Sequence, residues 1–227
     1  MPEGAIEHDT RASRSVGNAG YEGPFVLSTE HFLPGDNVLA VEVHQASSGS
    51  SDIVFGLTLD AVVATSDESY AGALALLEGL RVTELMYHAE DGSEFDFIEL
   101  QNISDVTLDL TGVRFAKGIE FTFPPMTLAP GEYVVVVSDL AAFRSVYGGS
   151  VKVAGSYSGN LSNGGEDVVL QLPLPLEAAI MRFTYSDQWY PSTDGAGRSL
   201  AIVDPMADVV TWSQADSWQP ANPAPGW

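Results

Sequence analysis

The feature that most constrains the fold is an alternation of apolar and polar side chains between Glu94 and Val137. It is clearest in Glu99-Leu100-Gln101 and recurs in Thr107-Leu108-Asp109-Leu110. A period of two places successive side chains on opposite faces of an extended strand, so each strand is expected to bury one face. Strands of this kind need a second layer to cover them. The stretch therefore predicts the middle of an antiparallel β-sandwich.

Strand-like runs continue at regular intervals from Leu80 onward, with turn residues between them. They are predicted at 81–87, 95–102, 107–114, 119–123, 132–137, 151–153, 168–172, 179–185, 199–203 and 209–212. Such spacing is typical of a sandwich, so residues 80–213 are assigned to one all-β domain. A short helix is expected at 140–147, because Asp139 can cap it. The proline-rich residues 214–227 are predicted to be a linker.

A helical connector is expected before this domain, at 65–79. Thr65 and Glu68 have the spacing of a capping box, and Tyr70, Leu74 and Leu77 recur at helical spacing. These features predict a helix over about 67–78. Its apolar stripe is interpreted as packing surface between two domains.

Residues 1–64 are predicted to be part of a β domain. Strands are expected at 25–28, 37–44 and 53–59, which supply two apolar faces but too few strands to cover them. The run from Leu33 to Gln45, followed by Ser50-Ser51-Asp52-Ile53, resembles the closing strands of a galactose-binding-like jelly roll. The resemblance implies a partial jelly-roll β-sandwich and nothing about a ligand.

Composition excludes several function classes. The 227 residues include 9 basic and 31 acidic side chains, a formal charge of -22, so the surface repels nucleic acid and anionic membranes. No apolar run approaches the roughly 20 residues of a membrane span. Cysteine is absent, which removes disulfides and thiolate chemistry and leaves the redox compartment unspecified. The first residues lack the features of a secretion signal, which is therefore expected upstream.

Six stretches in the second domain carry a family resemblance. They are Val82–Tyr87, Phe97–Asn102, Leu108–Gly112, Leu128–Tyr133, Ser158–Glu166, and Trp189–Pro191 through Asp194–Leu200. Together they resemble the lamin tail domain, an immunoglobulin-like β-sandwich found in nuclear lamins and in bacterial exported proteins. The resemblance implies an immunoglobulin-like antiparallel sandwich without enzymatic activity. It also implies an adhesive, positioning or partner-binding role outside the cell or at its surface.

No catalytic residues are predicted. The chain lacks a Gly-x-Ser-x-Gly elbow, a His-Glu-x-x-His helix and a phosphate-binding loop. His88 is the one histidine of the second domain, and a histidine beside an acidic loop is most often a surface residue. Glu84 and Glu99, on apolar strands, can accept hydrogen bonds from nearby backbone amides or from an arginine.

One candidate metal site lies in the hairpin that follows His88. Its carboxylates are Glu90, Asp91, Glu94 and Asp96. Converging carboxylates can supply the oxygen ligands that calcium prefers. The alternative is a solvated acidic tip, since no EF-hand spacing is present, and no other cofactor is expected.

Aromatic residues form a second candidate site. Trp189 and Tyr190 precede Pro191, and Trp212 lies near the C-terminal edge. Exposed aromatic rings can stack on sugars. The alternative, which we favour, is that Trp189 and Trp212 close the ends of the core.

These observations predict a non-catalytic structural, adhesive or partner-binding module of a larger exported multidomain protein. The alternative is a carbohydrate-binding accessory module for an enzyme domain elsewhere in the same protein. The expected partners are a protein or an extracellular polysaccharide, together with neighbouring domains of the same chain.

Overall fold

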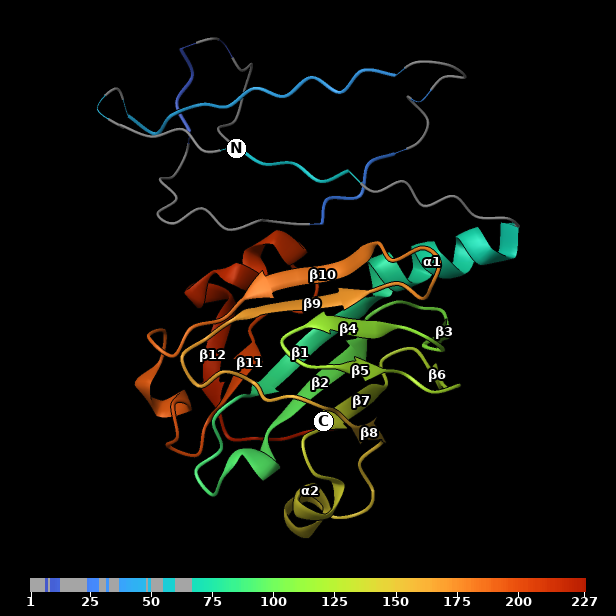
Figure 1. Cartoon of the computed structure of the whole chain (residues 1–227), viewed down its shortest axis with the longest axis vertical. Helices are drawn as coiled ribbons and strands as arrows, with labels where there is room; N and C mark the ends of the chain where they lie inside the picture. Colours follow the sequence, from blue (N-terminus) through green and yellow to red (C-terminus); the bar gives the residue numbers. More distant parts are fainter. Residues whose placement is uncertain are drawn as a thin grey trace. The chain divides into compact units, whose positions relative to one another are not determined.

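The computed structural model describes residues 7, 9–12, 24–28, 32, 37–47, 49, 55–59 and 67–227. The chain divides into two compact units, one formed by residues 1–21 and 26–59 and the other by 22–25 and 60–227. Figure 1 shows the strands and helices of the second unit. In the part of the chain that is described, no helix is long and apolar enough to span a membrane.

The first unit differs from its sequence prediction. No strand is formed within the described parts of the predicted strands, 25–28, 37–44 and 55–59. Apolar side chains there, such as Val38, Phe55 and Leu57, are about half exposed or more. Residues 53 and 54 lie outside the described residues.

The predicted connector helix is present as α1, Asp67–Gly79, and its last residue leads directly into the first strand. The side chains of Ala73 and Leu76 are buried in the core of the second unit. The face that packs on this domain differs from the predicted stripe, since Leu77 is partly buried against the core whereas Tyr70 is exposed.

The second unit is mostly β and contains three sheets (Figure 1). The strands are β1 Leu80–Met86, β2 Phe97–Asn102, β3 Leu108–Asp109, β4 Arg114–Lys117, β5 Phe121–Thr122, β6 Thr127–Leu128, β7 Tyr133–Val137, β8 Val153–Ser156, β9 Asp167–Gln171, β10 Ala179–Thr184, β11 Ser199–Ile202 and β12 Trp218–Ala221. Most of these strands lie within or beside the predicted runs, whereas β6 and most of β4 were not predicted. The helix expected after Asp139 is α2, Leu140–Tyr147, and Asp139 accepts from the Ala142 amide. Short 3₁₀ helices are η2 Ser93–Phe95, η3 Pro191–Thr193, η4 Val209–Ser213 and η5 Ala215–Ser217.

The large sheet has the strand order β12-β11-β1-β2-β7-β8, and a second sheet has the order β10-β9-β4-β5. Strands β3 and β6 form a small third sheet. All of these pairs are antiparallel except β7 with β8, which is parallel. This arrangement is the all-β, immunoglobulin-like sandwich that the strand spacing and the resemblance predict.

Because side chains alternate along each strand, neighbouring cross-strand rows of the large sheet lie on its opposite faces. Leu85, Ile98 and Val136 pair across β1, β2 and β7 and belong to the main core. The next row, Met86, Phe97 and Val137, lies on the opposite face with Phe143 of α2. Both faces of this sheet are therefore covered, one by the second sheet and the other partly by α2.

Two predictions near the C-terminus are wrong in the second unit. The strand expected at 209–212 is the 3₁₀ helix η4, because the Asp208 side chain caps its first turn. The linker expected at 214–227 contains β12, which pairs along its length with β11. Its Trp218 is buried in the core.

Candidate functional site

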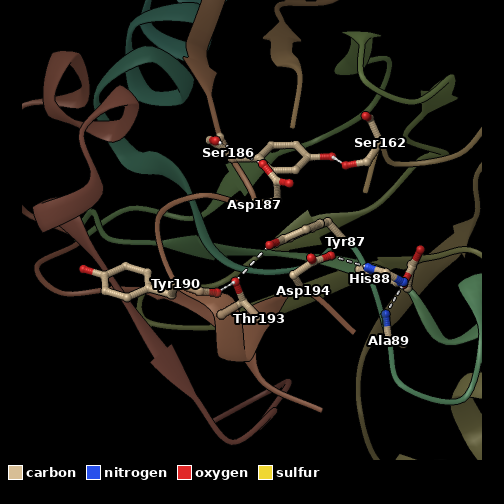
Figure 2. A network of polar contacts seen from close by, with 11 residues as sticks. Tyr87, His88, Ala89, Ser162, Ser186, Asp187, Tyr190, Thr193 and Asp194 are labelled. Atoms are coloured by element: carbon tan, nitrogen blue, oxygen red, sulfur yellow. Dashed lines mark hydrogen bonds and ion pairs between the residues drawn. The ribbon is translucent and has the colours of Figure 1, made fainter. Parts of the chain in front are cut away.

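Polar side chains gather at one end of the sandwich, where the β1–β2 connection meets the loop between β10 and β11 (Figure 2). The Tyr87 hydroxyl lies 2.9 Å from Oγ1 of Thr193. Thr193 donates its own hydroxyl proton to the Tyr190 carbonyl at 2.9 Å, so Tyr87 is the donor to Thr193. Both side chains are buried, and their bond fixes the loop against the end of β1.

A histidine–aspartate pair lies beside this contact. Figure 2 shows His88 facing Asp194, with 2.6 Å between Nδ1 and Oδ1. The Gly195 amide donates to the His88 carbonyl at 3.1 Å. Gly195 has φ +72°, and a Cβ there would lie 3.1 Å from the imidazole. Glycine is therefore required for the ring to lie against the loop.

The pair has one part of a catalytic triad, an imidazole held by a carboxylate. A triad also needs a nucleophile on the other ring nitrogen. In the described part of the chain, the hydrogen bond that His88 makes through its ring is the one to Asp194. The geometry is that of a loop clamp, and the pair is partly exposed.

The four predicted metal ligands do not act together. Glu90, Asp91 and Glu94 are exposed, whereas Asp96 is buried with an exposed fraction of 1%. Asp96 accepts the Ala89 amide at 2.9 Å, and burial raises the pKa of its carboxyl group to about 6. Among the residues that the structure describes, no three His, Asp or Glu side chains lie together as a metal-binding group. Asp96 thus shapes the hairpin, and calcium binding stays a prediction without a preformed cluster in that region.

The predicted aromatic residues are placed differently from one another. Trp212 is fully buried and donates from Nε1 to the Val82 carbonyl at 3.0 Å, so it presents no face to a ligand. Trp189 and Tyr190 are partly buried and pack against the core. The Tyr190 hydroxyl also lies 3.0 Å from the Ala215 carbonyl and 2.9 Å from that of Trp218. Trp189 and Tyr190 retain some exposed surface, while Trp212 belongs to the core.

Glu84 and Glu99 are buried residues whose backbone partners were not predicted from the sequence. They accept backbone amides, as their position predicts, but the donors are Ala224 and Gly226. Both donors lie in the stretch that composition assigns to a linker. Periodicity could not find them, because a segment lying across a sheet face has no period of its own.

Residues 77–187 match the family model of the Lamin Tail Domain. This is a non-catalytic, immunoglobulin-like domain family, and the match includes β1 through β10. No curated protein and no solved structure gives a further match. Strands β11 and β12 and the residues after them lie beyond the lamin tail match. The two strands nevertheless belong to the large sheet of the sandwich.

Proposed function

We propose that this chain is a non-catalytic structural, adhesive or partner-binding module of a larger exported multidomain protein. The lamin tail match supports the non-catalytic part of this proposal. The formal charge of -22 favours a protein or polysaccharide partner over nucleic acid.

One observation carries the proposal: the polar groups at the end of the sandwich are used to hold its loops together. Tyr87 binds Thr193, His88 binds Asp194, and Asp96 binds the Ala89 amide. Catalytic side chains act on a substrate, so their donor and acceptor atoms need to face a shared cavity without being engaged by other protein groups. The groups described here instead connect β1 and its hairpin to the loop before β11.

The experiment compares D194N with the control D187N, which changes a carboxylate in the same loop. Removing the His88–Asp194 pair should lower the melting temperature by about 1–3 °C, because a partly exposed ion pair contributes up to about 1 kcal/mol. The control should melt close to wild type. Neither protein should hydrolyse chromogenic ester, glycoside or phosphate substrates above buffer.

Hydrolysis by the wild-type chain that D194N abolishes would overturn the proposal. The carbohydrate-binding alternative keeps one supporting observation, the exposed surface left on Trp189 and Tyr190. A polysaccharide that binds the wild-type chain on a glycan array, but does not bind W189A, would favour that alternative.

A further inference from the structure

The C-terminal strap, residues 222–227, lies on the face of the large sheet away from the main core. The strap follows β12 at one edge of the sheet. Ala224 contacts Glu84 of β1, and Gly226 contacts Glu99 of β2 and lies beside Val151, just before β8. In Figure 1 this dark red segment runs from β12 to the C-terminus beside β7 and β8. The strap therefore crosses the sheet instead of extending it.

Two buried glutamates lie under the strap. Glu84 of β1 and Glu99 of β2 are direct cross-strand partners, flanked in the same row by Ala201 and Val135. Their exposed fractions are 5% and 3%. Buried carboxylates are unfavourable unless their oxygens accept hydrogen bonds, and two neighbouring ones also repel each other. The two carboxyl groups therefore need hydrogen-bond donors around them.

The strap supplies those donors at every second residue. The Ala224 amide lies 3.2 Å and 3.4 Å from the two oxygens of Glu84. The Gly226 amide lies 2.6 Å from Oε2 of Glu99. The hydroxyl groups of Ser199 and Thr83 donate to the Oε1 atoms of Glu84 and Glu99, respectively. Each carboxylate thus accepts one strap amide and one hydroxyl group.

Proline occupies the alternate strap positions, Pro223 and Pro225. Proline has no amide proton, so all the N–H groups between 223 and 226 donate to a buried carboxylate. A segment on a sheet face cannot pair with a strand, and any other N–H group there would need its own acceptor. The proline pattern and the glutamate spacing are therefore complementary.

The contact surface continues past the second glutamate. Gly226 adjoins a groove of about 460 Å³ that Tyr133, Val151 and Lys152 also line. Lys152 is held there by Glu132, with 2.8 Å between Nζ and Oε1. Gly226 has φ +91°, and a Cβ there would lie 3.4 Å from Val151. The distance to Val151 is an ordinary contact, so it is the positive φ that favours glycine at the position that meets Glu99.

We propose that Glu84 and Glu99 form a recognition site for an extended, uncharged peptide with proline at alternate positions, and that the strap occupies this site as an intramolecular ligand. The ligand is recognised through two backbone amides two residues apart, with a small residue at the second. This inference goes beyond the proposed function, since none of its contacts are among those at the end of the sandwich. Glu84 and Glu99 lie within the lamin tail match, whereas the strap lies beyond its end at residue 187.

The test uses a fluorescent peptide with the sequence of residues 221–227 and three full-length proteins. The first protein is wild type. The second, A224P/G226V, is designed to release the strap, because it removes the Ala224 amide donor and places a branched side chain against Val151. The third carries these two substitutions together with E84A/E99A. A tethered strap acts at a millimolar effective concentration, so the peptide should bind A224P/G226V roughly tenfold or more tightly than it binds wild type. The protein that also carries E84A/E99A should lose this binding.

A matched peptide with both prolines replaced by alanine should bind A224P/G226V several-fold more weakly, because its two added N–H groups find no acceptors. Circular dichroism melts establish that each protein is folded, and A224P alone replaces the double variant if the latter does not melt cooperatively. Equal binding of the peptide by wild type, by A224P/G226V and by the protein that also carries E84A/E99A would overturn the proposal. A folded A224P/G226V protein that binds no peptide would also overturn it.

Discussion

At the residue scale, Glu99 shows how a single buried charge makes stability depend on pH. Burial and, to a smaller extent, the neighbouring Glu84 carboxylate raise the pKa of its carboxyl group from 4.5 to about 7, against the opposing effect of the bonds from Gly226 and Thr83. The pKa of Glu84 is also raised by burial. Tyr133 of β7 and Tyr147 of α2 are further titratable groups near this pair.

The sign of the effect follows from proton binding. The unfolded chain releases the Glu99 proton near its ordinary pKa, whereas the folded chain keeps it to about pH 7. The stability present below the unfolded pKa is therefore lost as pH rises to about 7. The shift corresponds to roughly 3 kcal/mol, since one pKa unit is about 1.4 kcal/mol.

E99Q should remove this loss. Glutamine can turn its carbonyl oxygen toward the Gly226 amide and its amide group toward the Thr83 hydroxyl, so both contacts persist without a charge. We expect E99Q to be more stable than wild type at pH 8 and to lose less stability between pH 5 and 8. Urea unfolding at the two pH values measures this, with E120Q, an exposed glutamate, as the control. Parallel pH dependence in wild type and E99Q would contradict the argument.

At the scale of elements, the end of β2 is held by one side chain that reaches two other segments. The Asn102 amide group donates to the Val106 carbonyl at 2.8 Å and to the Leu128 carbonyl of β6 at 2.9 Å. Its oxygen accepts the Ser104 amide at 2.9 Å, and the side chain is fully buried. Asn102 therefore joins the large sheet to the small β3–β6 sheet.

Replacing this side chain by alanine should remove the Asn102 donors to the Leu128 and Val106 carbonyls and the acceptor of the Ser104 amide, while the Val106 carbonyl keeps its contact with the Ser104 hydroxyl group. N102A is expected to lower the free energy of unfolding by about 2–4 kcal/mol. The exposed Asn163 provides the control, because N163A should change it by less than about 0.5 kcal/mol. Chemical unfolding curves give both values, and a stability of N102A within error of N163A would contradict this role.

Sequence reasoning was accurate for elements whose residues carry a pattern and inaccurate where tertiary position decides. The alternation through β1, β2 and β7 identifies strands and their faces, because opposite rows meet different environments. Strand β12 was missed because Pro220 and the prolines after it resemble a linker. Proline is tolerated there since β12 is an edge strand, where an amide proton is dispensable.

The same limit applied to the candidate sites. Asp96 was a predicted metal ligand, but its side chain is buried. Trp212 was offered as a sugar contact or, as favoured, as a core residue, and it is buried. Glu84 and Glu99 were recognised as acceptors, while their donors lie more than 120 residues away in the chain. Contacts of this separation leave no local pattern.

At the scale of the whole molecule, the sandwich extends to the C-terminal strap. The lamin tail match ends at residue 187, yet β11 and β12 complete the large sheet and the strap covers its two buried glutamates. The later residues are thus a structural part of the domain, and the proposed peptide site lies on the face that they cover.

The most direct measurement is amide hydrogen exchange of the full chain, followed residue by residue by NMR near neutral pH. The amides of Ala224 and Gly226 should exchange at least about a hundredfold more slowly than those of an unstructured peptide of the same sequence. In the E84A/E99A variant both should lose most of this protection, while β1 and β2 keep theirs. Exchange of the two wild-type amides at the rate of the unstructured peptide would contradict the account.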